Sequence, residues 1–164
     1  MGECRLYKYV GPPEIAKSVN LSSSRTAVTC GEDVMRLTSG RSLTFTFIID
    51  PQRTLWIADR QSEHVACARG GPVLSAGEIT FEVSDGKAIA TYVTNQSTGY
   101  CPEPVSWSAV ASALDRAGIE HYGRFDLACE FRRCDCGQIN IVKDGVFECA
   151  VCGAELSKFW NLAE

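Results

Sequence analysis

The chain has 164 residues, of which 45% are apolar and 22% charged, as expected for one globular domain with at most a small appendage. Its formal net charge of −4 provides no overall positive field, so nucleic acid and anionic membrane surfaces are not expected partners. There is no apolar run of about 18 residues, and the first ten residues, MGECRLYKYV, lack the apolar core of a secretory signal. We therefore expect a cytoplasmic protein with no membrane segment.

The first third of the chain predicts short elements of both kinds. A strand is expected over CRLYKYV (4–10), and a short helix over 11–20, where Pro12 or Pro13 suits the first helical position. A second helix over 31–40 would end at Gly40. The β-branched and aromatic runs at 42–50 and 54–60 flank the turn-forming PQR and predict the clearest hairpin.

The middle of the chain predicts another hairpin and one helix. The alternating runs 77–83 and 88–94 flank Asp85-Gly86, a strong hairpin signal. The clearest helix covers 106–119, with Ser106 as expected N-cap and Gly118 as stop. A last strand over 125–134 leads into a cysteine cluster. The pattern predicts an α+β fold with a largely antiparallel sheet over 1–130, and a small metal-bound lobe over 131–164 packed on it.

Nine cysteines are too many, and odd in number, for a secreted disulfide framework. In a reducing cytosol the same count is natural if four cysteines bind a metal and the others are small core residues. We therefore expect no structural disulfides among the five that lie outside the C-terminal cluster, which are Cys4, Cys30, Cys67, Cys101 and Cys129.

The C-terminal cluster has the spacing of a metal site: C-x-C, twelve residues, then C-x-x-C. Each pair, Cys134 with Cys136 and Cys149 with Cys152, is followed at once by a glycine that can complete a tight turn. The intervening INIVKDGVFEC (139–149) predicts a hairpin that returns the second pair to the first. Four thiolates favour structural zinc. Another metal such as iron, a redox disulfide and coincidence are the alternatives, and the single residue inside the first pair makes a tighter loop than usual.

This C-terminal segment resembles a zinc ribbon, a small module found in transcription, translation and modification proteins. Such modules sometimes bind nucleic acid, but from Phe131 to Trp160 this one has four basic residues against four acidic ones: Arg132, Arg133, Lys143 and Lys158, and Asp135, Asp144, Glu148 and Glu155. A neutral ribbon is a poor phosphate-binding surface, so a structural staple is the favoured interpretation. Phe159 and Trp160 are expected to pack against the body or, if exposed, to anchor a partner.

The block from His64 to Pro104 carries a second pattern: Gly70-Gly71, Val73, Ala76-Gly77-Glu78, Asp85-Gly86, Asn95, Ser97, Tyr100 and Pro102. It resembles a module of plant IQ-motif calmodulin-binding proteins and of the C-terminal regions of bacterial polymorphic toxins. In that module a histidine precedes the tyrosine, where this chain has Gly99. The resemblance implies a context of conflict or defence but no settled activity, and no IQ motif accompanies it.

Two functions from different classes follow. The first is an accessory or adaptor protein that contacts an unidentified protein partner. The alternative is an enzyme or small-ligand binder, resembling a toxin, with a groove around His64, Glu78 and Tyr100 and with Cys101 as a candidate nucleophile. The chain contains no GxSxG, P-loop, HExxH or zinc-deaminase pattern. We expect no nucleic acid partner and one structural zinc ion.

Overall fold

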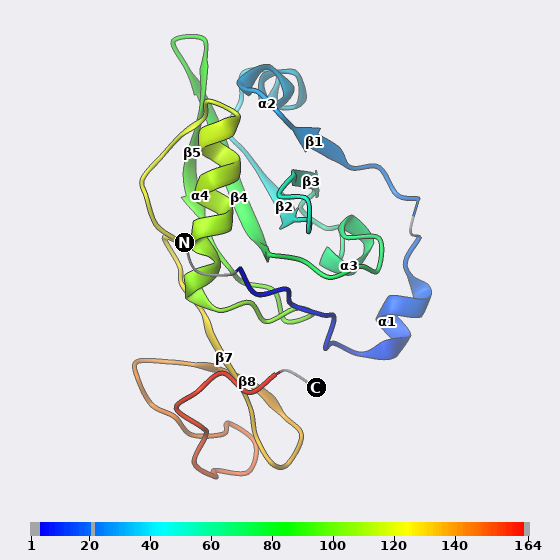
Figure 1. Cartoon of the computed structure of the whole chain (residues 1–164), viewed down its shortest axis with the longest axis vertical. Helices are drawn as coiled ribbons and strands as arrows, with labels where there is room; N and C mark the ends of the chain where they lie inside the picture. The colour runs from blue at the N-terminus through cyan, green and yellow to red at the C-terminus, as the bar shows by residue number, and fades with distance from the viewer. Residues whose placement is uncertain (1–3, 21, 163–164) are drawn as a thin grey trace.

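A six-stranded sheet forms the body of the protein (Figure 1). The structure is a computed structural model that describes residues 4–20 and 22–162. The strand order is β1-β3-β2-β4-β5-β6, and all neighbouring pairs are antiparallel except β5 and β6. The strands are β1 Thr26–Val28, β2 Leu43–Ile49, β3 Leu55–Asp59, β4 Ser75–Ser84, β5 Lys87–Val93 and β6 Glu120–His121. The predicted α+β class with a mostly antiparallel sheet is confirmed.

Short helices cover the two faces of this sheet. They are α1 Pro13–Ser18, α2 Gly31–Thr38, α3 His64–Cys67 and α4 Trp107–Arg116. The largest apolar cluster lies on the face packed against α4 and α2, where Phe47, Ile79 and Phe81 meet Val110 and Leu114. A second cluster on the other face joins α3 to the N-terminal segment. No helix in the described residues is long and apolar enough to cross a bilayer.

Both predicted hairpins are present. β2 pairs with β3 around the PQR turn, and β4 pairs with β5 around Asp85 and Gly86, whose φ angles are 52° and 72°. Positive φ at both central residues is the geometry that matches the strand twist in a two-residue turn, which is why Asp-Gly suits this position. A register shift at Thr80/Phe81 then bends β4.

Three sequence predictions are wrong in detail. The expected strand over 4–10 reduces to a single bridge between Tyr7 and Val73. The expected strand over 125–134 is regular only as β7, Glu130–Arg133. Ser106 does not cap α4, because its hydroxyl shares a 2.9 Å hydrogen bond with the buried hydroxyl of Ser75. The Ser106 hydroxyl thus bonds to a residue distant in the sequence and not to the backbone N–H groups at the start of α4.

The C-terminal part forms a second, two-stranded sheet below the body (Figure 1), in which β7 pairs with β8, Ile139–Val142. Its contact with the body is an apolar cluster of Cys101, Cys129, Phe131 and Leu162. The division of the chain into 1–130 and 131–164 stays a prediction.

Residues 157–162, which we call the terminal strap, return from this lobe toward the body. The buried Arg132 guanidinium donates to the carbonyls of Ser157 and Lys158 at 3.0 and 2.9 Å. Trp160 packs edge-on against Tyr7, with ring centroids 5.5 Å apart, and its Nε1 donates to the Cys101 carbonyl. The expectation that Trp160 packs on the body is therefore confirmed. Phe159 instead is 82% exposed.

Candidate metal centre

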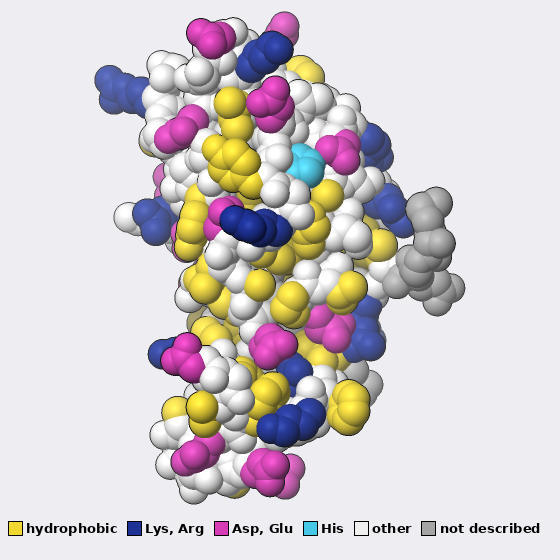
Figure 2. All heavy atoms as spheres, turned by 90° about the vertical axis from the view of Figure 1, so that its left-hand side faces the viewer, with side chains coloured by type: hydrophobic (Ala, Val, Ile, Leu, Met, Phe, Trp, Pro, Cys, Tyr) yellow, Lys and Arg dark blue, Asp and Glu magenta, His cyan; other side chains and the backbone are white. Residues whose placement is uncertain are grey.

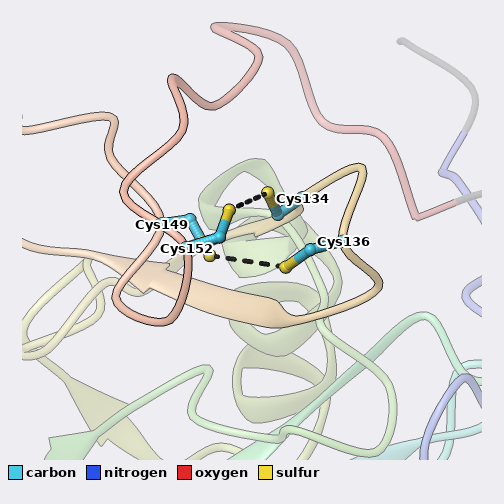
Figure 3. A group of neighbouring side chains, drawn as sticks. All are labelled: Cys134, Cys136, Cys149 and Cys152. Carbon is cyan, nitrogen blue, oxygen red and sulfur yellow. Dashed lines mark hydrogen bonds between the residues drawn. The ribbon is translucent and has the colours of Figure 1, made fainter.

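The four cysteine sulfurs of the C-terminal cluster converge on one point (Figure 3). All four lie within 4.8 Å of one another. The Sγ atoms of Cys134 and Cys152 are 3.5 Å apart, and those of Cys136 and Cys149 are 3.8 Å apart. A tetrahedral ion with Zn–S bonds of about 2.3 Å needs sulfurs separated by about 3.8 Å. The four side chains can therefore coordinate one metal ion with little movement.

Each cysteine pair lies on a tight turn, as the sequence predicts. The Gly137 N–H donates to the Cys134 carbonyl at 2.8 Å, and the Gly153 N–H donates to the Cys149 carbonyl at 3.0 Å. Both glycines have positive φ, 95° and 75°. A left-handed residue closes each turn at a position where a side chain would strain the backbone. The unusually short C-x-C pair thus still forms a closed turn.

The connection between the pairs is less regular than the predicted hairpin. Asp144 and Gly145 do form the turn, with φ of 53° and 70°, but the chain returns through a single bridge between Lys143 and Val146. β8 pairs with β7 instead. The bridge between Glu148 and Glu155 closes the loop of the second cysteine pair, and a hydrogen bond from the Ala150 N–H to Asn140 of β8 attaches that loop to the β7–β8 sheet.

Asn140 supports the second pair and was not singled out by the sequence analysis. Its side chain is buried, and Oδ1 accepts a 2.9 Å hydrogen bond from the Ala150 N–H, inside the Cys149–Cys152 loop. A polar residue at an inward position of the apolar run INIV was the available signal, because a buried amide needs a partner.

The backbone around Cys149 favours an anionic sulfur. The N–H groups of Cys152 and Val151 point at its Sγ and lower the pKa of this thiol to about 6. Such donors remain useful when a metal is bound, because they neutralise part of the charge of the thiolates. Cys134 and Cys149 are buried, whereas Cys136 and Cys152 are exposed. Four thiolates would leave no coordination position for water, which is the arrangement of a structural rather than a catalytic site.

The residues proposed for an enzyme groove have partners within the fold. The His64 Nε2–H donates to the Gly77 carbonyl at 2.8 Å, and Glu78 forms a 3.4 Å ion pair with Arg60. Tyr100 is completely buried, and its hydroxyl donates to the Gly71 carbonyl at 2.7 Å. His64 lies beside Glu78, because it bonds to the carbonyl of the preceding residue, Gly77. The Tyr100 hydroxyl bonds to Gly71 instead and forms no hydrogen bond with either of them.

Cys101 is also completely buried, with its Sγ 3.3 Å from the Thr98 carbonyl. Burial raises the pKa of this thiol to about 12. A nucleophilic cysteine needs a lowered pKa and access to substrate, and Cys101 has neither. None of the nine cysteines is joined to another by a disulfide.

Several residues that carry the module resemblance contact one another or the backbone beside them. His64 bonds to Gly77, and Tyr100 bonds to Gly71. The buried Asn95 amide donates to the carbonyls of Pro102 and Cys129 at 2.9 and 2.8 Å, and its oxygen accepts from the Cys129 N–H. The sequence analysis placed His64 and Tyr100 in a candidate groove, whereas in the structure their polar atoms bond to the backbone of neighbouring segments.

The burial of His64 predicts a pH dependence of stability. Burial lowers the pKa of this imidazole below its usual 6.5. Below pH of about 6.5 the unfolded chain therefore binds a proton here that the folded chain does not, so the free energy of unfolding falls as pH falls. We expect His64→Gln to flatten that fall between pH 6.5 and 5. Urea unfolding at several pH values measures it, and equal slopes for both proteins would contradict it.

The chain was compared with protein-family models, with curated proteins and with solved structures, and none of the three comparisons gave a match. The resemblance of the central block to the toxin-associated module therefore has no support from a family match. The four converging cysteines are the feature on which a functional interpretation depends.

Proposed function

We propose that this is a zinc-stabilised accessory protein that works by binding another protein. The observation that carries the proposal is the closed set of four sulfurs within 4.8 Å. Its geometry suits zinc, and its lack of a place for water suits a structural role. The Cys134, Cys136, Cys149 and Cys152 thiolates would hold the ion and fix both turns of the lobe.

The surface supports a protein partner better than a nucleic acid. Acidic and basic side chains are mixed over the face seen in Figure 2, without a broad patch of one sign. Large hydrophobic side chains are exposed in the lobe: Val146 at 58%, Val151 at 69% and Phe159 at 82%. An exposed aromatic side chain such as Phe159 can anchor a contact between proteins. Trp107 is not available as an anchor of this kind, because it is partly buried against Phe125.

The biological setting in this proposal comes from the resemblance of the central block alone, which implies conflict or defence in bacteria. The genes beside this one would test that setting, since a toxin or immunity gene in the same operon is the expected neighbour.

Two measurements test the proposal. Elemental analysis of the purified protein should give about one zinc per chain. Affinity capture from cells of the source organism should retain a stoichiometric partner with wild type and with Glu78→Gln, and lose it with Phe159→Ala. Thermal melts of both variants should match wild type, because both positions reach the surface. A metal-free folded protein, or a biological activity abolished by Glu78→Gln with partner capture intact, would contradict the proposal.

A further inference from the structure

The N-terminal segment 5–10 is hydrogen-bonded to the body at Tyr7 and again at Val10. Tyr7 exchanges both backbone hydrogen bonds with Val73, at 2.7 and 2.9 Å, and the Val10 N–H bond to the Gly99 carbonyl ends the segment. In an antiparallel pair, the residues beside a doubly bonded one direct their backbone groups to the opposite side. Those residues are Leu6 and Lys8, and no backbone bond joins them to any other described residue. The segment therefore has an open edge from Leu6 to Lys8.

This open edge faces a cleft of about 330 Å³. Segment 5–10 forms one wall, and Trp160 and Leu162 of the terminal strap form the other. Figure 1 shows the end of the strap returning toward the N-terminal segment. The Trp160 ring is held by Tyr7 and by its bond to Cys101, so the apolar wall is already in place. Leu6 is 48% exposed beside it.

Two cations, Arg5 and Lys8, line the same cleft. Arg5 lies 3.6 Å from Glu103 and stacks over the Trp160 ring at 4.6 Å, so its charge is already partnered. Lys8 is exposed and forms no ion pair with the described residues. The cleft thus offers an unpaired positive charge next to an apolar wall and an open strand edge.

We propose that this cleft binds an extended segment of a protein partner as an added β-strand. The backbone of the segment would bond to Leu6 and Lys8, an apolar side chain would lie against the exposed part of Trp160, and an acidic side chain would pair with Lys8. Main-chain bonds at an open edge give affinity, and alternate side chains give specificity. The inference rests on the proposed function, because it names the kind of partner that the protein binds.

A library of random dodecapeptides displayed on phage, selected against the zinc-loaded full chain, tests this inference. Enriched peptides should carry an acidic residue close to an apolar one. Synthetic copies should bind in fluorescence anisotropy, and Lys8→Glu should weaken that binding by about tenfold or more, whereas Lys87→Glu, at the distant β4–β5 turn, should leave it unchanged. Both lysines are exposed, so neither variant should alter the thermal melt.

N-methylation of the peptide separates strand addition from simple contact. Methyl groups on alternate amides should abolish binding in one register and leave it in the other, because only one edge of the peptide would bond to the chain. Binding that tolerates both registers, or that ignores Lys8→Glu, would overturn the inference, as would a selection without enrichment. A dimer of this chain that Lys8→Glu dissociates would assign the cleft to a second copy instead.

The two proposals fail in different ways. If the partner captured by wild type is also captured by Lys8→Glu, the cleft is the wrong site and the proposed function stands. If wild type captures no partner, the proposed function itself fails.

Discussion

Cys149→Ser is expected to unfold the C-terminal lobe and to lower the zinc content to near zero. Structural zinc contributes on the order of 10 kcal/mol in small domains, which equals the usual stability of a whole domain. Serine keeps the size of the side chain but loses the thiolate, and the N–H groups of Val151 and Cys152 would then face a neutral oxygen. Elemental analysis, melting temperature and solubility measure the effect.

Cys129→Ser is the matched control, because Cys129 is buried at the edge of the lobe but lies outside the sulfur cluster. It should retain one zinc per chain and lose at most about 1–3 kcal/mol, the cost of burying a hydroxyl. If Cys149→Ser melts at the wild-type temperature and keeps its metal, the zinc proposal is wrong.

Gly77→Ala is expected to destabilise the body by at least about 3 kcal/mol, which is a large effect for one methyl group. A Cβ at this position would overlap the Thr94 carbonyl oxygen and lie 2.7 Å from the Thr94 carbonyl carbon. The obstacle is backbone at the end of β5, which cannot rotate away. His64 also bonds to the Gly77 carbonyl, so displacement here would disturb α3. Chemical denaturation with the free energy of unfolding as readout tests this.

Gly31→Ala provides the comparison. Gly31 begins α2, and its added Cβ would lie 3.8 Å from the Ala88 Cβ, an ordinary contact. Alanine favours the helix and restricts the unfolded chain, so stability should rise by up to about 1 kcal/mol. Equal effects at the two glycines would show that close approach at Gly77 does not limit the fold.

The sequence predicted those elements whose signals are local. Alternation and Asp85-Gly86 sufficed for β4 and β5, and cysteine spacing with its glycines sufficed for the convergence of four sulfurs. The N-cap predicted at Ser106 was wrong, because its hydroxyl hydrogen-bonds to Ser75 in β4, a strand that is distant in the sequence. The short parallel strand β6 had no local signal, since its pairing with β5 depends on how α4 returns the chain.

The candidate groove around His64 and Tyr100 shows a deeper limit of sequence reasoning. Polar residues in a recurring pattern suit catalysis and loop fastening equally well, and only burial separates the two. Tyr100 is fully buried and bonds to a carbonyl, and Asn95 is buried with three hydrogen bonds to the backbone. Both arrangements are those of residues that hold loops in place. No periodicity in the sequence carries that information.

Arg132 joins the two proposed binding sites. It lies in β7, two residues before the candidate metal ligand Cys134, and holds the carbonyls that begin the terminal strap, whose Trp160 and Leu162 line the cleft. Loss of order in the lobe would therefore remove one of the contacts that position that wall, while the contacts of Trp160 with Tyr7 and Cys101 would remain. If both proposals hold, thermodynamic reciprocity requires that zinc raise the affinity for the peptide and that the peptide raise the affinity for zinc by the same factor. Partner binding would then be stronger in the metallated protein, so that cellular zinc supply would become an input to its assembly.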